Sequence, residues 1–201
     1  MNYFIYDDKA INHLRAACPR LGEIIKDMGK INRPVEPDLF KSLVTGIISQ
    51  QISVKSAQTV SQRLMNLVDA FTPEGLLAMS DEEIQQCGLS FKKVSYIKGI
   101  CAAVVTKTLD LEGLRQLADE EVVAELVKLS GIGQWSGEMF LIFSLMRPDV
   151  VSYGDLVIRK AIMKLYGLDK LTKKEFKEYV KRYSPYGSVA SLYLWAYGNG
   201  G

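Results

Sequence analysis

Residues that build metal centres and disulfides are scarce in this chain of 201 residues. It contains a single histidine, His13, which argues against a histidine-based metal site because such sites combine several ligands. The three cysteines, Cys18, Cys87 and Cys101, are scattered along the sequence and odd in number. They therefore indicate buried thiols in a reducing compartment.

Long apolar runs and an excess of one charge are also absent. No apolar run reaches the length of a membrane-spanning helix, so we expect no membrane partner. Two early acids, Asp7 and Asp8, argue against a secretion signal at the start of the chain. The formal net charge is only +2, which is no strong argument for a nucleic-acid partner. Such a partner would require the basic residues to gather on one face.

The apolar residues recur at helical spacing, and no long segment alternates between apolar and polar residues. We therefore expect an all-α fold, organised as one domain or as one domain of two lobes. Asp7 or Asp8 is expected to cap the first helix, Pro37 to lie in the first turn of a later one, and Ser90 to cap another. Further helices are expected at about 53–68, 119–128, 134–145, 155–166, 171–182 and 186–196.

Two glycines, Gly131 and Gly133, lie between two amphipathic segments and predict a tight hairpin between helices. Glycine can adopt positive φ, and it leaves neighbouring backbone amides unshielded. The next helix is expected to begin at about Gln134, so its free amides and its positive dipole end point in the same direction. This pattern predicts a seat for one phosphate, supported by Ser136. A glycine pair of this kind can also be a simple helix end and turn.

A lone acid, Asp155, lies at the expected start of the next helix. By itself it is well explained as a helix cap, stabilised by the dipole and by a hydrogen bond. A phosphate seat combined with one carboxylate suggests chemistry beside a nucleic-acid backbone.

Three further segments complete a set of motifs, namely Ile48–Ser53, Gly88–Lys93, and Ser184–Ala190 with Trp195. Together with the hairpin and Asp155, they resemble the helix-hairpin-helix DNA glycosylase superfamily and, within it, the AlkA-like 3-methyladenine DNA glycosylase II family. The resemblance covers about residues 36–197. Each motif alone is weakly specific, whereas the complete set in this order is strongly specific.

The resemblance implies a two-lobed helix-hairpin-helix glycosylase fold. Residues 38–146 would form a helical barrel-like lobe that includes the helix-hairpin-helix at about 119–146. Residues 1–37 and 147–201 would form a second helical lobe, with the active-site cleft between the two. Residues 1–35 are too short and too helical for the extra β-rich domain of longer relatives. No cysteine follows Cys101, which excludes the four-cysteine iron–sulfur cluster of some superfamily members.

The resemblance also implies roles in catalysis. Asp155 would stabilise the positive charge that builds on the sugar as the N-glycosidic bond breaks, and it would orient or deprotonate the attacking water. Trp135 occupies the position at which strand-cutting members resemble one another in carrying a nucleophilic lysine, which implies a monofunctional enzyme. Trp135 would form the base pocket with Met139 and Tyr186. Both aromatic residues can instead be packing residues.

The implied DNA contacts lie at two places in the chain. The amides of Gly131 and Gly133, with Gln134 and Ser136, would bind the backbone. In the superfamily, the loop after residue 49 inserts a side chain into the gap left by the flipped base. This role falls on Gln51, with Ile52 beside it, although adjacent glutamines mean little by themselves.

Other positions are explained more simply or depart from the family pattern. A solvated helix start is the simplest explanation for the cluster formed by Phe91, Lys92, Lys93 and Lys98, whereas the resemblance implies that these residues are partly structural and leaves a phosphate contact unassigned. Proline, a small residue and arginine are usual where this chain has Ser152, Val157 and Gly187. These departures affect the expected pocket geometry more than the fold.

The resemblance implies a monofunctional DNA glycosylase that excises alkylated purines from double-stranded DNA containing a damaged base. We expect a monomer located in the bacterial cytoplasm, at the nucleoid, or in a eukaryotic nucleus. No cofactor is expected, but the hairpin carbonyls hold a monovalent cation in some relatives. The alternatives are a non-catalytic DNA-structure-binding protein, a glycosylase for uracil or deaminated purines, and a helical scaffold with chance motifs.

Overall fold

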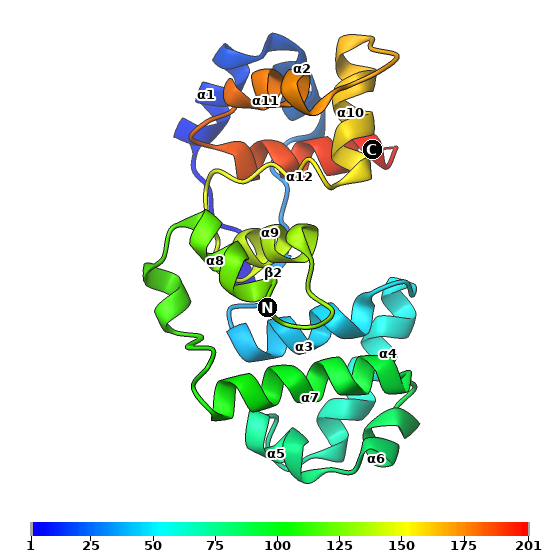
Figure 1. Cartoon of the computed structure of the whole chain (residues 1–201). Coiled ribbons are helices and arrows are strands. Elements are labelled where there is room, and N and C mark those ends of the chain that lie inside the picture. The colour runs from blue at the N-terminus through cyan, green and yellow to red at the C-terminus, as the bar shows by residue number, and fades with distance from the viewer. Residues whose placement is uncertain (1, 201) are drawn as a thin grey trace. The chain divides into compact units, whose positions relative to one another are not determined.

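The computed structural model describes residues 2–200 and confirms the all-α expectation (Figure 1). The sole strands among these residues are β1 (Asn2–Tyr3) and β2 (Pro34–Val35), which pair antiparallel. A pair this short carries no alternating pattern, so sequence periodicity did not predict it. No helix in the described range is both long enough and apolar enough to cross a membrane.

The chain divides into two compact units. Unit 1 comprises Met1–Val35 and Leu141–Gly201, and unit 2 comprises Glu36–Phe140. The second boundary falls within helix α9 (Gln134–Phe143), a few residues before the expected boundary at 146. The helix of the hairpin therefore begins in unit 2, and its last residues belong to unit 1.

Unit 1 is built around its C-terminal helix. Besides this helix, α12 (Gly187–Gly198), it contains α1 (Asp8–Ala17), α2 (Pro19–Met28), α10 (Leu156–Tyr166) and α11 (Lys173–Lys181). All residues of α12 from Gly187 to Leu194 are buried, and α12 packs against α2 and α10. A helix apolar on all sides suits this position, because neighbours cover it from more than one direction.

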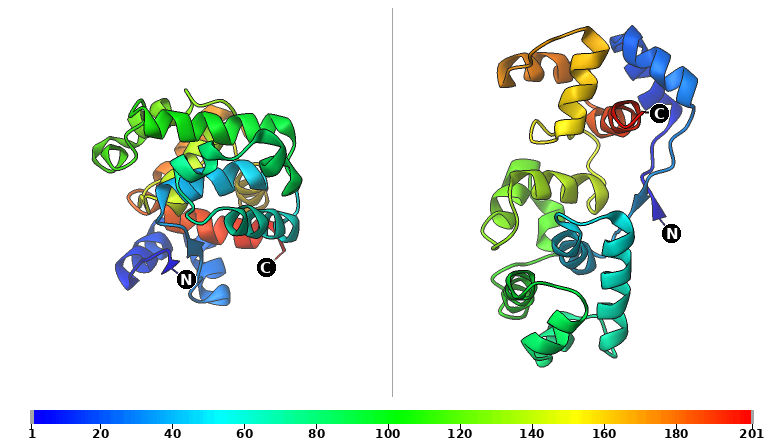
Figure 2. Two further views of the ribbon diagram at one scale, coloured as in Figure 1. Left: turned by 90° about the horizontal axis from the view of Figure 1, so that it is seen from below. Right: turned by 90° about the vertical axis from the view of Figure 1, so that its right-hand side faces the viewer.

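Unit 2 is built around two adjacent helices, α3 (Leu39–Ser49) and α7 (Phe91–Val105), which lie side by side (Figure 1, Figure 2). The remaining helices are α4 (Val54–Leu67), α5 (Pro73–Ala78), α6 (Asp81–Gln86), the short 3₁₀ helix η1 (Gly113–Gln116), α8 (Asp119–Leu126) and the start of α9. The core contains Ile47 and Ile48 from α3, with Ile97 and Ile100 from α7.

The helix starts follow the expected caps with one correction. Asp7 caps α1 by accepting the Ala10 amide at 3.1 Å, and Ser90 caps α7. Pro37 was expected in the first turn of α3, and this was wrong. Asp38 is the N-cap instead, accepting the Lys41 amide at 2.9 Å.

The three cysteines are buried free thiols, as the sequence indicated. Burial raises the pKa of Cys101 to about 12, and it also raises the pKa of Cys87. Both thiols therefore stay protonated at neutral pH and act as small core residues.

Candidate functional site

A hairpin of seven residues joins α8 to α9. Successive backbone bonds tighten it: the Leu129 amide donates to Leu126 O, and the Ile132 amide donates to Leu129 O, both at 3.1 Å. The arms approach closely at Gly137 on α9, where a β-carbon would lie 3.2 Å from Cγ1 of Val123 on α8. Small residues at such a contact allow the two backbones to come together.

The two hairpin glycines differ in what they require. Gly131 has a φ of +89°, and a side chain there would collide with the ring of Tyr96. Gly133 has no positive φ, and nothing lies within 4 Å of where its β-carbon would stand. The conformational freedom of glycine is therefore used at Gly131, whereas Gly133 adopts no positive φ.

The N-terminal end of α9 presents its backbone to solvent. Gly133 and Gln134 are exposed and Ser136 is half-buried. The first amides of an α-helix have no intrahelical acceptor, and the dipole favours an anion at this end. The Gln134 amide group donates to Glu138 Oε1 at 2.8 Å, one turn into the helix. The geometry can hold a phosphate on backbone donors.

The segment between α3 and α4 contains the residue expected to enter the duplex. Gln51 is exposed with a φ of +59°, a rare backbone conformation for a residue with a side chain. Ile52 beside it is 41% exposed. Ser53 then caps α4 by accepting the Ser56 amide at 3.1 Å. Strained backbone in an exposed turn is typical of functional segments.

The structure brings this segment and the hairpin together within unit 2. The Gln50 side-chain amide donates to the carbonyl oxygen of Gly131 at 2.8 Å. Lys93 Nζ donates to the carbonyls of Ile48 and Gln50 at 2.8 and 2.7 Å, at the C-terminal end of α3. Gln50 thus links the end of α3 to the hairpin, and Lys93 links the same end of α3 to α7.

Of the two interpretations of the cluster at the start of α7, the structural one holds for two lysines. Lys93 is half-buried, and desolvation lowers its pKa. Lys98 donates to the Met79 carbonyl at 2.6 Å and pairs with Asp81 at 2.8 Å. Phe91 and Lys92 are exposed, as expected. The signal for Lys93 was its place in the Gly88–Lys93 motif, but its carbonyl partners lie more than forty residues earlier in the chain.

The expected pocket residues of α9 share one face of that helix. Trp135 and Met139 are four residues apart and therefore neighbours on the helix surface. The Trp135 side chain is 46% exposed, and Met139 is half-buried. An indole this accessible can present its ring to a ligand.

In unit 1, Asp155 is a buried carboxylate at the start of α10. Its side chain is 6% exposed, and Oδ1 accepts the Ile158 amide at 3.0 Å. The cap interpretation and the catalytic interpretation are compatible, because the cap fixes the carboxylate in place at the N-terminal end of α10. Lys160, five residues later, is exposed.

Tyr186 and its neighbour Gly187 are fixed by different contacts in unit 1. The Tyr186 ring meets the edge of His13 with centroids 5.3 Å apart. Asp149 Oδ1 accepts the Gly187 amide at 2.9 Å, and a β-carbon at position 187 would lie 2.7 Å from that oxygen. The backbone of Gly187 therefore lies so close to the Asp149 carboxylate that an arginine, or any other side chain, at position 187 would collide with it.

The other two departures from the family pattern also have local explanations. Ser152 is fully buried, and its carbonyl accepts the Asp155 amide at 3.4 Å. Val157 packs against Gly198, where a β-carbon would lie 2.7 Å from Val157 Cγ1. The family pattern has a small residue at position 157, whereas in this chain the small residue at the contact is Gly198 on α12.

These features define the class: an all-helical protein with a glycine hairpin between two helices and a buried carboxylate at a later helix start. The family model of the HhH-GPD superfamily of base excision DNA repair proteins matches residues 44–185, and the chain belongs to this superfamily. The resemblance deduced from the motifs is therefore confirmed.

Similar proteins are found among characterised sequences and solved structures. DNA-3-methyladenine glycosylase 1 of Schizosaccharomyces pombe is 31% identical over 195 residues, which cover 93% of this chain and 86% of the relative. The crystal structure of a DNA-3-methyladenine glycosidase from Bacillus halodurans has a TM-score of 0.87 and 36% identity, covering 100% of this chain and 94% of that one. A Schizosaccharomyces pombe 3-methyladenine DNA glycosylase in complex with abasic DNA has a TM-score of 0.81 and 31% identity, covering 93% and 95%.

Proposed function

We propose that this protein is a monofunctional DNA glycosylase that excises alkylated purines of the 3-methyladenine and 7-methylguanine type from double-stranded DNA. The names of its relatives support the reaction and the class of lesion. The observation that carries the proposal is Asp155, a buried carboxylate fixed at a helix start inside the region matched by the superfamily.

The proposed chemistry needs one carboxylate. As the bond between base and sugar breaks, positive charge develops on the sugar, and the anionic side chain of Asp155 stabilises it. The same carboxylate orients the water that adds to C1′ and accepts its proton. A cationic alkylated base is already a good leaving group, so no second acid is required.

Trp135 supports two parts of the proposal. Its exposed indole can stack on an electron-poor base, and a desolvated cation–π contact of this type is worth about 2 kcal/mol. An indole nitrogen cannot form an imine with the sugar. We therefore infer a hydrolytic enzyme without strand-cutting activity, with Met139 and Tyr186 completing the pocket.

DNA binding is assigned to the hairpin and the adjacent turn. The amides at Gly131, Gly133, Gln134 and Ser136 would bind one phosphate, and Gln51 with Ile52 would fill the gap left by the flipped nucleotide. The protein would act as a monomer on duplex DNA. The hairpin carbonyls offer oxygen donors that suit a monovalent cation, although Gly131 O already accepts the Gln50 amide.

The test is base release from methylated duplex DNA by the wild type and by Asp155→Asn. Asparagine is as good an N-cap as aspartate, so the fold should persist while the charge is lost. Loss of an electrostatic catalytic group costs about 10²–10³ in rate. Asp38→Asn, the same change at the N-cap of α3, is the matched control and should retain full activity. Base release by Asp155→Asn within about tenfold of wild type would overturn the mechanism.

The same assay separates the alternatives. No release from any methylated substrate, together with intact duplex binding, would support a non-catalytic DNA-binding protein. Release of uracil or hypoxanthine in preference to methylated purines would replace the proposed lesion class while retaining the role of Asp155.

A further inference from the structure

The charge of this protein is divided unequally between its two units. Unit 2, which contains the hairpin, has 9 Lys and Arg against 14 Asp and Glu, a net charge of −5. Unit 1 has 16 Lys and Arg against 9 Asp and Glu, a net charge of +7. The overall value of +2 therefore hides a strongly basic unit and an acidic one.

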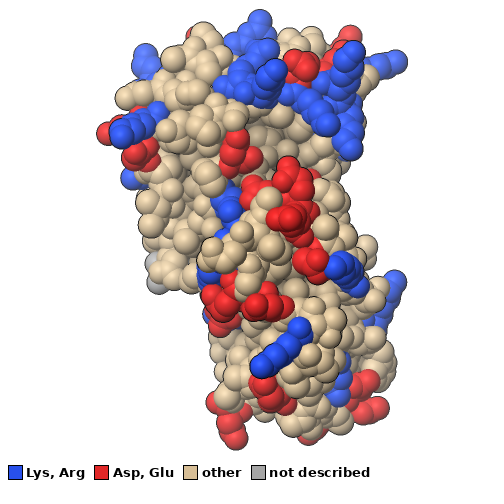
Figure 3. Space-filling view, turned by 60° about the vertical axis from the view of Figure 1, so that its left-hand side comes forward, with Lys and Arg blue, Asp and Glu red and all other residues tan. Residues whose placement is uncertain are grey.

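Much of the positive charge of unit 1 lies on and next to α11. Between Lys170 and Arg182 there are six basic residues and two acids. On the face shown in Figure 3, Lys and Arg gather on the surface of unit 1. The acidic hairpin unit cannot supply long-range attraction for a polyanion, so this attraction must come from unit 1.

Three lysines of α11 form one line. Lys174, Lys177 and Lys181 are spaced at i, i+3 and i+7, on the side of the helix away from the buried Phe176. All three are exposed. We call them the α11 lysine stripe. It is about 10 Å long at 1.5 Å per residue, which matches about three phosphates of one DNA strand at 3.4 Å per phosphate along the axis.

The charges of the stripe are not neutralised within the protein. Ion pairs such as Lys41–Glu36, Lys98–Asp81 and Lys128–Glu125 lie in unit 2. None of them involves a stripe lysine. Solvated, unpaired lysines on a regular helix face are ready to exchange counterions for phosphates.

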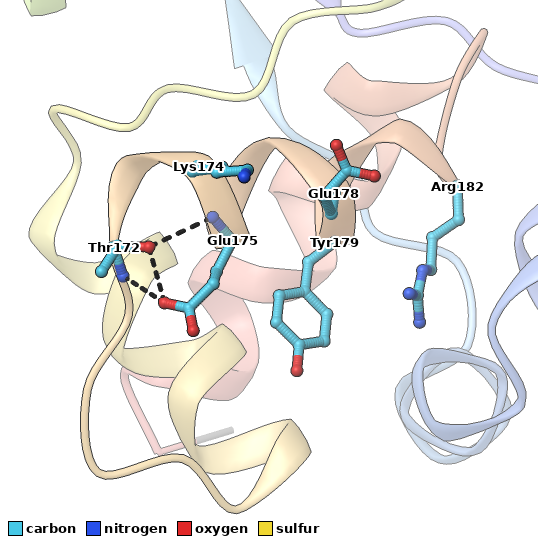
Figure 4. Close-up of a pocket in the computed structure, with 6 residues that line it drawn as sticks. All are labelled: Thr172, Lys174, Glu175, Glu178, Tyr179 and Arg182. Atoms are coloured by element: carbon cyan, nitrogen blue, oxygen red, sulfur yellow. Dashed lines mark hydrogen bonds between the residues drawn. The ribbon is translucent and has the colours of Figure 1, made fainter.

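One of the two acids of α11, Glu175, caps the helix instead of pairing with the stripe. Figure 4 shows Glu175 directed back to the start of the helix, where it accepts from the Thr172 amide at 2.8 Å and from its hydroxyl at 2.6 Å. These bonds lower the pKa of Glu175. Glu178 lies next to the stripe, one turn after Lys174, and the two line a hollow of about 560 Å³ with Tyr179 and Arg182. Among the described residues, no ion pair within 4.0 Å joins Glu178 to a stripe lysine, so one acid adjoins the three lysines without neutralising them.

The end of α11 is stiffened by stacked cations and rings. The Arg182 guanidinium lies 5.5 Å from the centroid of Tyr166 and 5.2 Å from that of Tyr179. Arg20 lies 5.4 Å from Tyr166 and donates to the Leu165 carbonyl at 3.0 Å. These contacts hold the helix that carries the stripe against α2 and α10.

We propose that the α11 lysine stripe is a second DNA-contact surface, which binds the phosphate backbone of duplex DNA without regard to sequence or damage. The inference rests on the proposed function for its choice of polyanion. The hairpin positions the protein through backbone amides, whereas the stripe supplies the salt-dependent attraction that an acidic hairpin unit lacks.

The test compares full-length wild type with Lys174→Gln/Lys177→Gln/Lys181→Gln. Glutamine has nearly the helix propensity of lysine, so α11 should form, which circular dichroism can verify. Affinity for an undamaged duplex is measured by fluorescence anisotropy between about 50 and 200 mM NaCl. The plot of log K against log salt has a negative slope, and each lost phosphate contact makes it shallower by about 0.9. The slope of the stripe variant should therefore be smaller in magnitude by about 2 to 3.

A dispersed triple variant is the matched control. Lys9→Gln/Lys26→Gln/Lys107→Gln removes the same charge from three exposed positions on different elements. Its slope should stay within about 0.5 of wild type. Equal slopes for the two triple variants would overturn the stripe as a contact surface, since net charge alone would then explain the change.

Base release separates the two proposals. At saturating methylated duplex, the stripe variant should release base within about twofold of wild type, because the stripe touches no reacting group. If the wild type releases no base but the slope still falls in the stripe variant, the proposed function fails and the surface stands. If the wild type releases base normally and the stripe variant has an unchanged slope, the stripe is not a DNA-contact surface, whereas the proposed function is supported.

Discussion

The side-chain amide of Gln50 donates a 2.8 Å hydrogen bond to the carbonyl oxygen of Gly131, which lies 81 positions later in the chain. Lys93 binds the carbonyl of the same glutamine at 2.7 Å. The neighbouring Gln51 has a φ of +59° and an exposed side chain. The turn expected to enter the duplex and the hairpin expected to bind its backbone are therefore joined by one residue.

Removing the hydrogen bond between Gln50 and Gly131 should destabilise the fold. Gln50→Ala leaves the Gly131 carbonyl without its partner, and we expect a loss of about 1 kcal/mol in unfolding free energy. Gln62→Ala removes the exposed bond to Asn66 on α4, and it should cost under about 0.5 kcal/mol. Chemical denaturation measures both. Equal losses would mean that the Gln50 bond is no more than a surface contact.

Lys93 should matter more than its neighbour Lys92. Lys93→Met removes two bonds from a charged donor to the Ile48 and Gln50 carbonyls, each worth about 1.5 kcal/mol or more. Lys92→Met removes a long cation–π contact of 5.9 Å to Tyr96 at an exposed site, worth under about 1 kcal/mol. Thermal unfolding of the two variants should show a clearly larger fall in Tm for Lys93→Met. The reverse order would show that the buried amine does not stabilise the end of α3.

Sequence reasoning succeeded where the determinant is local. Asp7, Ser90 and Asp155 cap helices because each side chain reaches an amide three residues later, and this relation is visible in the sequence. It failed where the partner is distant. For Lys93 the residues alone favoured a solvated helix start, and only the resemblance implied a structural role, because its acceptors at 48 and 50 become neighbours only when α7 packs on α3.

The two hairpin glycines illustrate the same limit. Either glycine could adopt positive φ, but only Gly131 does so, and its other constraint is the ring of Tyr96 on α7. Gly131→Ala should therefore destabilise by at least about 1 kcal/mol, from the unfavourable φ and the collision. Gly133→Ala has open space and should be tolerated. Unfolding free energies of the pair provide the measurement, and a neutral Gly131→Ala would contradict this geometry.

The reaction product should retain an intact strand. With Trp135 in the position of a nucleophilic lysine, no imine should form between the protein and the abasic sugar. Borohydride treatment during reaction with methylated duplex should therefore trap no covalent adduct, and a strand-cutting glycosylase serves as the positive control. A trapped adduct would end the monofunctional assignment, and Lys160→Met would then test the exposed amine nearest to Asp155 in sequence.

The phosphate seat can be tested at Gly133 because the structure leaves room there. Gly133→Asp and Gly133→Asn add side chains of nearly equal size into space with nothing within 4 Å, so both variants should fold. The aspartate places a negative charge where a phosphate should bind, at the positive end of α9. We expect Gly133→Asp to weaken binding to damaged and undamaged duplex strongly and to a similar extent, leaving only the salt-dependent attraction of the α11 lysine stripe, and Gly133→Asn to weaken it far less.

Gln51→Ala should behave differently from both Gly133 variants, because its side chain is needed only when a base has left the stack. Its affinity for an abasic-site duplex should fall more than its affinity for an ordinary duplex, since filling the gap offsets part of the few kcal/mol of unstacking. Anisotropy with both duplexes separates the two effects, because phosphate contacts position the protein without reading the base. If folded Gly133→Asp retained normal duplex affinity, the hairpin would be only a turn. The remaining affinity would then have to come from the lysines of unit 1.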